Sequence, residues 1–352
     1  CLVGSEMCIR DRNNMKYYVK IEFSKLFEQT GKYTATSKAR LDVENILLGR
    51  NFETITIKRH FLNSVLGNIE LLIKVGILWI RLKRNDLVFL QYPIMNLGAF
   101  RFCFKSISKA RVIAIVHDLP SYRFNNQLKF RNTEIRILNS FSHIIVHTVQ
   151  MKKVLMADGV NTKIDVLEMF DYLLPIDLKC VLKRNVIVFA GALHKSLFLK
   201  KMDAMTLSED FNLYGAYNPQ LKNRHLHYRG KFLPNDISKI EGDWGLLWDG
   251  DDIEQCSGQF GKYLQIIAPH KFSLYIASGL KILVWKESAM ASLVEKYHVG
   301  LKISKLSEIH DVISALSEEE RELMEKNVLI LSERIRKGNA FGSILSNILN
   351  EQ

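Results

Sequence analysis

Short runs of β-branched and aromatic residues alternate along most of the chain with longer segments in which apolar residues recur at helical spacing. This alternation is typical of parallel sheets with helices on both faces. In the first half, the pattern predicts strands at residues 16–23, 54–58, 87–92, 112–117, 144–147 and 164–167. Helices are expected between them, at residues 38–49, 62–83, 97–108, 127–140 and 149–158.

The rhythm stops between residues 171 and 184 and then starts again. The second series predicts strands at residues 186–190, 211–214, 226–228, 245–248, 282–285 and 301–303, and then helices alone at 318–349. A chain of 352 residues is long enough for two domains. We therefore expect an α/β protein with two tandem Rossmann-like domains, at 15–172 and 186–330, joined by a linker at 173–185. Two such domains create a cleft at the carboxyl ends of their strands.

The first residues do not enter this prediction. Residues 1–12 look like a translated sequencing-adapter fragment, so we exclude residues 1–14 and expect the natural chain to begin at Met15. The remaining cysteines, Cys103, Cys180 and Cys256, are far apart and form no metal-binding or disulfide pattern. With no uncharged run of about 20 residues, this pattern favours a cytoplasmic protein.

The net charge of +12 calls for an anionic partner, which can be nucleic acid, an anionic membrane face or a phosphorylated substrate. Apolar residues mixed with cations at 66–84 and 97–111 suit a membrane interface. Partly buried helices with solvated cationic rims would show the same pattern. We expect contact with the inner face of the cell membrane through these segments and no nucleic-acid binding. The oligomeric state stays open, and a homo-oligomer is compatible with the sequence.

The most informative motif is an acidic, glycine-containing turn after the strand near residue 245, followed by a helix that opens at Pro269. The helix begins with His270, Lys271 and Ser273. Free backbone N–H groups beside an ammonium form a suitable site for a diphosphate. Alternatively, Pro269 merely starts a helix and Lys271 is solvated.

Other residues in the second half extend this candidate phosphate site. Gly191 follows a strand and would let the backbone approach a ligand, and Lys195 would neutralise phosphate charge. The repeated glycines of a dinucleotide motif are missing, so NAD and FAD are not expected. Lys195 and Lys271 together would offset the charge of a departing diphosphate, so no metal is required. Tyr214 could flank a base or simply pack, and Asp249 could bond sugar hydroxyls or be a solvated turn residue.

In the first half, His117 and Asp118 stand at the end of a strand, where either could accept a proton from a hydroxyl nucleophile. Alternatively, Asp118 caps the next segment and His117 bonds to the backbone. Thr36 and Ser37 begin a helix and could grip phosphate or sugar hydroxyls, although ordinary N-capping explains them more simply.

Several of these motifs together resemble one known family. They are Thr34-Ala-Thr-Ser-Lys38, Gln91-Tyr-Pro93, Val116-His-Asp118, Phe170-Asp-Tyr172, Phe189-Ala-Gly191 with Lys195-Ser196, Tyr214-Gly215, Gly245-Leu-Leu-Trp-Asp-Gly250 and Pro269-His-Lys-Phe-Ser-Leu-Tyr275. The chain from Met15 onward is similar to the bacterial family of β-1,6-galactofuranosyltransferases and the streptococcal glucosyltransferase that acts on serine-rich adhesins. The Trp-Asp-Gly and Pro-His-Lys blocks are the specific part of the resemblance.

The resemblance implies a GT-B fold in which the second domain holds a UDP-sugar, the first holds the acceptor, and a helix at 331–352 packs back on the first domain. It implies that Lys195 and Lys271 contact phosphate and that the Thr34 to Lys38 loop faces the transferred sugar. Ala192 and residues 266–268 depart from the family pattern, where asparagine is common. These departures bear on the identity of the donor more than on the fold.

We therefore expect a cytoplasmic glycosyltransferase that moves galactofuranose or glucose from a UDP-sugar to a sugar hydroxyl of a lipid-linked or protein-linked glycan. Neither a cofactor nor a metal is expected. One alternative is a sugar-nucleotide epimerase of the same architecture, which needs more acids and histidines in its cleft. Another is a non-catalytic basic module that binds membrane or nucleic acid. A rise in melting temperature with UDP, but not with duplex DNA, would exclude this last alternative.

Overall fold

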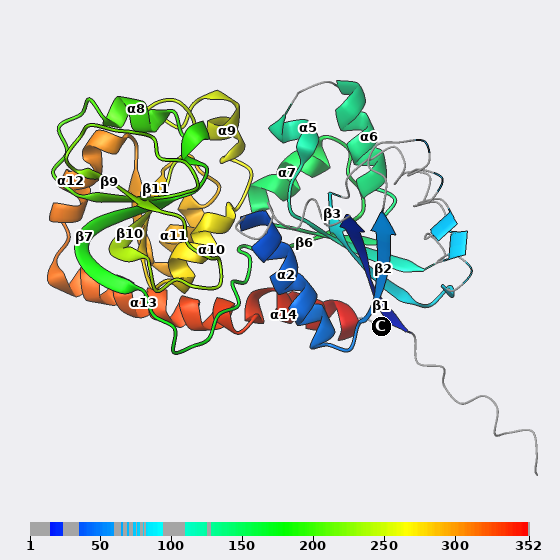
Figure 1. Cartoon of the computed structure of the whole chain (residues 1–352). Coiled ribbons are helices and arrows are strands. Elements are labelled where there is room, and N and C mark those ends of the chain that lie inside the picture. The colour runs from blue at the N-terminus through cyan, green and yellow to red at the C-terminus, as the bar shows by residue number, and fades with distance from the viewer. Residues whose placement is uncertain are drawn as a thin grey trace, which may run out of the picture.

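The computed structural model describes residues 15–23, 35–59, 82–93, 110–124 and 128–350, with scattered single positions between 65 and 80. Figure 1 shows two α/β lobes, one formed by the first half of the chain and one by the second. Each lobe contains a six-stranded sheet in which all neighbouring strands are parallel. This confirms the predicted fold class of two Rossmann-like domains.

The first sheet has the strand order β2-β1-β3-β4-β5-β6. Its strands are β1 (Lys16–Phe23), β2 (Glu53–Arg59), β3 (Leu87–Tyr92), β4 (Arg111–Val116), β5 (His143–Val146) and β6 (Lys163–Val166). The helices are α2 (Ala35–Leu48), α5 (Pro120–Arg123), α6 (Leu128–Leu138) and α7 (Val149–Ala157). Every residue of β3 is buried, as expected for a strand of a sheet covered on both faces. The predicted strands are all present, with ends that differ by one residue where they differ.

The second sheet has the strand order β12-β11-β10-β7-β8-β9. Its strands are β7 (Val181–Ala190), β8 (Phe211–Tyr214), β9 (Leu226–Gly230), β10 (Glu241–Leu247), β11 (Lys281–Trp285) and β12 (Gly300–Ile303). Its shorter helices are η1 (Leu193–Lys195), α8 (Phe198–Met202), α9 (Gly258–Tyr263), α10 (His270–Ala277), α11 (Ala291–Tyr297), η2 (Leu306–Glu308) and α12 (Ile309–Ser314).

Four strands of the second sheet begin earlier than predicted: β7 by five residues, β10 by four, and β11 and β12 by one each. β7 starts at Val181, within the expected linker, because Val181 and Leu182 pair with Glu241 and Gly242 of β10. The first five residues of β7 are exposed and form no continuous apolar run in the sequence. This part of the strand is defined by its backbone pairing with β10, so the hydrophobic pattern of the sequence could not predict it.

The strand order determines where a ligand can bind. The order reverses between β1 and β3 in the first sheet and between β7 and β10 in the second. Ligands of open parallel sheets bind beyond the carboxyl ends of the strands at such reversals. In the second domain these ends carry Gly191 after β7 and the turn at Trp248 after β10.

Two long helices complete the chain, α13 (Glu318–Arg336) and α14 (Asn339–Asn350). Figure 1 shows α13 along the second lobe and α14 beneath the first. The Phe341 ring of α14 lies 5.4 Å from that of Phe89 in β3, centroid to centroid. The Asp171 carboxylate accepts hydrogen bonds from the first-turn amides of α14, at 2.9 Å from Ala340 and 2.8 Å from Phe341. The last helix therefore packs on the first sheet.

The helix expected at 97–108 lies outside the described residues, as do most positions of the helix expected at 62–83 and most of the 66–84 and 97–111 segments. In the part of the chain that the structure describes, no helix is both long enough and apolar enough to span a bilayer.

Candidate functional site

Helix α10 is held tightly against the second sheet. A Cβ atom at Gly245 of β10 would lie 2.2 Å from Cγ of Tyr275, so the tyrosine ring occupies the space of the missing side chain. The Tyr275 hydroxyl accepts a hydrogen bond from the backbone N–H of Ala190, at 2.9 Å. Because α10 connects β10 to β11, its first turn lies at the carboxyl edge of the sheet, where its first N–H groups lack helical partners.

Lys271 brings a cation to this turn. Its Nζ donates a 2.8 Å hydrogen bond to the carbonyl oxygen of Trp248 and lies 4.8 Å from the centroid of the Phe189 ring. Burial lowers the pKa of Lys271, and the negative charge of Asp249 opposes this effect. The ammonium is thus partly desolvated and is held at the ends of β7 and β10.

The turn after β10 requires its glycine. Gly250 has a φ of +104°, and a Cβ there would lie 2.2 Å from the carbonyl oxygen of Ser257. The Asp249 carboxylate is half-buried and accepts a 2.9 Å hydrogen bond from the Gly250 N–H. On the β7 side, Gly191 is exposed, with open space where a Cβ would stand. The backbone at Gly191 is therefore accessible to a ligand.

Lys195 is the second cation at this edge. Its side chain is exposed, and its Nζ lies 6.0 Å from the centroid of the Phe260 ring in α9. Neither Lys195 nor Lys271 forms a salt bridge with a carboxylate of the described residues. Both charges are therefore available to an anion.

Two other predicted residues have hydroxyls that are engaged within the fold. The Ser273 hydroxyl is buried and donates to the carbonyl oxygen of Phe170, at 2.7 Å. The Tyr214 hydroxyl donates to the carbonyl oxygen of Lys239, at 3.0 Å, and accepts from the N–H of Glu241, at 2.9 Å. In this conformation both hydroxyls support the fold.

Histidines from both domains gather around Phe170. The His117 ring stacks on Phe170 with centroids 5.0 Å apart, the His147 ring lies 4.6 Å away at a steep angle, and the His270 ring lies 6.0 Å away. Burial lowers the pKa of His147 to about 4 and that of His270 to about 3, and it lowers the pKa of His117 well below 6.5. All three rings are neutral near pH 7.

His270 has spare hydrogen-bonding capacity, since neither of its buried ring nitrogens has a hydrogen-bond partner among the described residues. Such groups are uncommon in folded proteins and call for an explanation, of which a role in binding a ligand is one. His147 was missed by sequence reasoning, although its place at the end of a predicted strand was a usable signal.

The hydrogen bonds of Gln91 determine the tautomer of His117. The Gln91 amide nitrogen donates to the Tyr18 hydroxyl, at 2.7 Å, and to the Arg40 carbonyl oxygen, at 3.0 Å. Its Oε1 therefore faces His117 Nε2, 2.6 Å away, and must accept a hydrogen bond from the Nε2–H group. A neutral His117 then carries its lone pair on Nδ1.

The Asp118 carboxylate is fully engaged. Oδ1 accepts hydrogen bonds from the Leu119 N–H, at 3.0 Å, and from the Tyr263 hydroxyl, at 2.6 Å, while Oδ2 is 2.5 Å from the Arg123 guanidinium. An aspartate held by three donors is less available as a base than a free one. The base would have to be released from these partners or supplied by His117.

At the start of α2, Thr36 and Ser37 lie in the first turn, and the side chain of Thr36 lies outside the described residues. Lys38 is buried and bonds to Asp42, at 2.6 Å, and to the carbonyl oxygen of Leu173, at 2.7 Å. Sequence reasoning missed Arg40, whose guanidinium donates to the carbonyl oxygen of Pro93, at 2.9 Å, beside the reversal of the first sheet.

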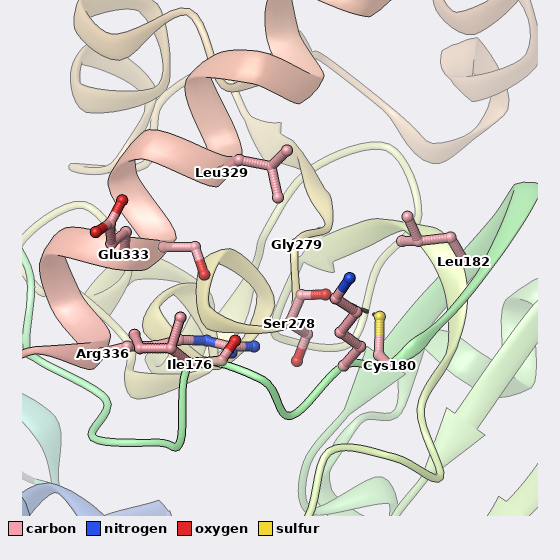
Figure 2. Close-up of a pocket in the computed structure, with 10 residues that line it drawn as sticks. Ile176, Cys180, Leu182, Ser278, Gly279, Leu329, Glu333 and Arg336 are labelled. Carbon is pink, nitrogen blue, oxygen red and sulfur yellow. Dashed lines mark hydrogen bonds between the residues drawn. The ribbon is translucent and has the colours of Figure 1, made fainter.

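A separate pocket of about 400 Å³ lies at the other end of α10, between the linker and α13. Figure 2 shows Ser278 and Gly279 in its wall, with Cys180 on one side and Arg336 on the other. The Cys180 thiol donates to the carbonyl oxygen of Ser278, at 2.8 Å, and burial raises the thiol pKa to about 11. Among the described residues, no group of three or more acids, histidines and cysteines could hold a metal ion.

Solved structures share the architecture. An Anabaena protein, HepE, in complex with UDP and glucose superposes with a TM-score of 0.58 at 11% identity, covering 96% of this chain and 100% of that one. The lipopolysaccharide glycosyltransferase WaaG superposes with a TM-score of 0.51 at 13% identity, covering 93% and 98%. The two Rossmann-like domains therefore have the GT-B arrangement.

Sequence comparisons lead to the same group of proteins. The β-1,6-galactofuranosyltransferase WbbI of Escherichia coli K12 is 27% identical over 324 residues, which is 89% of this chain and 94% of that protein. Glucosyltransferase 3 of Streptococcus gordonii is 23% identical over 338 residues, which is 95% of this chain and 99% of that protein. Profiles of the "Glucosyltransferase 3-like" N-terminal and C-terminal domains match residues 20–169 and 187–348. Since both domains match in order, this chain belongs to the Glucosyltransferase 3-like family of glycosyltransferases.

Proposed function

We propose that the protein transfers a hexosyl group, galactofuranose or glucose, from a UDP-sugar to a sugar hydroxyl in the synthesis of bacterial surface polysaccharide or glycoprotein. Its two curated relatives are a galactofuranosyltransferase and a glucosyltransferase. The observation that carries the proposal is the partly desolvated ammonium of Lys271, which has no carboxylate partner among the described residues and stands at the first turn of α10.

In this proposal the donor diphosphate lies against the first turn of α10, between Lys271 and Lys195. Gly191 and Asp249 face the nucleotide, with His270 beside the phosphates. The bond from the anomeric carbon to the phosphate oxygen breaks, and the two ammonium groups and the helix N–H groups stabilise the charge that develops on UDP. The reaction as proposed uses neither a metal nor a cofactor.

The acceptor hydroxyl approaches from the first domain, forms the new bond to the anomeric carbon and loses its proton. His117 Nδ1 and the Asp118 carboxylate are the proposed proton acceptors. His117 carries a free lone pair, whereas Asp118 must first be released by Arg123 or Tyr263. Thr36 and Ser37 are proposed to face the transferred sugar. Tyr214 and Ser273, whose hydroxyls bond to backbone groups, are proposed to hold the backbone around the donor site in place.

We further propose that the enzyme works in the cytoplasm at the inner membrane face. The segments 66–84 and 97–111 support this proposal by combining apolar residues with cations. Flotation with anionic vesicles tests it, and a protein that stays at the bottom of the gradient at low salt would contradict it.

A ligand panel tests the function. Melting temperature is measured with UDP, UDP-glucose, UDP-galactose, UDP-galactofuranose and UDP-N-acetylglucosamine, and with duplex DNA as the control. We expect UDP and one UDP-hexose to raise it and DNA to leave it unchanged. The stabilising donor is then incubated with candidate acceptors, with and without a chelator. Free UDP and a glycosylated product are expected in both cases, whereas an interconverted UDP-sugar without free UDP would indicate an epimerase.

A further inference from the structure

Helix α9 of the second domain reaches across to the first. The Tyr263 hydroxyl donates to Oδ1 of Asp118, at 2.6 Å, and accepts from the N–H of Leu119, at 2.8 Å. A phenol can do both at once, since it has one proton and accessible lone pairs. Tyr263 is only 4% exposed, and burial raises its pKa well above 10, so the hydroxyl keeps its proton at neutral pH.

The same helix makes further contacts with the segment after β4. The Gln259 amide donates to the carbonyl oxygen of Arg123, whose guanidinium is paired with Asp118. The Phe260 ring lies 5.8 Å from the Arg123 guanidinium and 6.0 Å from the Lys195 ammonium. Helix α9 therefore contacts a proposed phosphate-binding cation of one domain and the ion pair of the proposed base in the other.

The backbone around α9 leaves little room for it to shift. Gly258 has a φ of +68°, and a Cβ at Gly261 would lie 2.4 Å from the carbonyl carbon of Cys256. A Cβ at Gly250, in the turn after β10, would lie 2.2 Å from the carbonyl oxygen of Ser257, the residue before α9. The position of Tyr263 is thus coupled to the turn that carries Asp249.

We propose that Tyr263 is a positioning residue of the transfer reaction: from the donor-side domain, it fixes Asp118 and Leu119, and with them the end of β4, in the geometry that the acceptor meets. This inference rests on the proposed function. Tyr263 acts through Asp118 and does not itself touch the reacting atoms. Without its hydroxyl, Asp118 would keep Arg123 but lose the contact that ties it to the donor domain.

The test is Tyr263→Phe in the full-length protein, with Tyr297→Phe as the matched control. The Tyr297 hydroxyl also bonds to a carboxylate across the domains, Glu168 at 2.6 Å, but it does not touch the β4 end. Release of UDP from the donor found in the ligand panel gives kcat and KM, and calorimetry gives the Kd for UDP. We expect Tyr263→Phe to lower kcat about tenfold to a hundredfold. Its KM and UDP affinity, and the kcat of Tyr297→Phe, should change less than about threefold.

A double variant separates positioning from general stability. If Tyr263 acts through Asp118, Tyr263→Phe combined with Asp118→Asn should lose no more activity than Asp118→Asn alone. An unchanged kcat in Tyr263→Phe, an equal loss in Tyr297→Phe or additive losses in the double variant would overturn the proposal. Should Tyr263→Phe not fold, Gln259→Ala replaces it, because Gln259 is exposed and its loss should not impair folding. An unchanged kcat in Gln259→Ala would then overturn the proposal, and a lower kcat at unchanged KM would support it. A wild-type protein that turns over no UDP-sugar would instead refute the proposed function.

Discussion

Replacing Lys271 by methionine tests the donor site most directly. The change keeps an unbranched side chain of similar length and removes the ammonium that lies 2.8 Å from the Trp248 carbonyl oxygen and 4.8 Å from the Phe189 ring centroid. The apolar part of the contact with Phe189 is retained. The variant therefore isolates the charge from the packing.

The expected loss in binding is larger than the expected loss in stability. A hydrogen bond between charged groups contributes about 1.5–3 kcal/mol, which corresponds to a rise of about 10- to 150-fold in the Kd for UDP. For folding, the variant loses one hydrogen bond from the ammonium to the Trp248 carbonyl oxygen, which is also worth about 1.5–3 kcal/mol because the donor is charged. The burial that lowers the pKa of Lys271 also means that removing this charge relieves a desolvation cost.

Calorimetric titration with UDP and urea unfolding measure the two quantities on the same preparation. Lys195→Met provides a comparison, since Lys195 is exposed and its contact should be worth about 0.2–1 kcal/mol, or up to about fivefold in Kd. Lys200→Met, an exposed lysine of α8, is the control and should bind UDP as the wild type does. If Lys271→Met bound UDP with unchanged affinity, the first turn of α10 would not be the diphosphate site.

Three further changes probe the fold around the site. Gly245→Ala should lower the free energy of unfolding by about 1–3 kcal/mol in urea titration, since the new methyl group meets the buried Tyr275 ring at 2.2 Å; unchanged stability would contradict this packing. Burial raises the pKa of Asp171 to about 7, so the folded protein holds this proton more tightly than the unfolded one. As the pH rises from about 4 to about 7, the free energy of unfolding of the wild type should therefore decrease by up to about 4 kcal/mol, and Asp171→Asn should abolish this decrease. Identical pH profiles for the two proteins would refute the assignment. His270→Phe removes two ring nitrogens without partners among the described residues, so the melting temperature should stay the same or rise while UDP affinity falls by about two- to twelvefold. A lower melting temperature with unchanged UDP affinity would give His270 a structural role only.

Hydrophobic pattern was sufficient for the architecture because strands buried on both faces are continuous apolar runs bounded by turns. It located all the strands of both sheets, and with them the loops at their carboxyl ends where His117 and Gly191 stand. It failed at the start of β7, where Val181 and Leu182 are exposed and pair with β10 through the backbone.

The roles of individual side chains depended on tertiary structure. Ser273 looked free to meet a ligand at a helix N-terminus, but its hydroxyl bonds to the carbonyl oxygen of Phe170, which is 103 residues away in sequence. Asp118 looked like an available base, but three donors hold it, and one of them, Tyr263, comes from the other domain. The neutral histidines around Phe170 also come from both domains.

The amino-acid sequence by itself determined the alternation of strands and helices, the two domains and the motifs at the strand ends, because each depends on neighbours within a few residues. Only the tertiary structure decided which polar groups find partners across the domain interface and which, such as Lys271 and His270, are left with capacity for a ligand. The physical reason is that burial, hydrogen bonding and pKa depend on atoms brought together from distant parts of the chain, and such contacts leave no periodic pattern in the sequence.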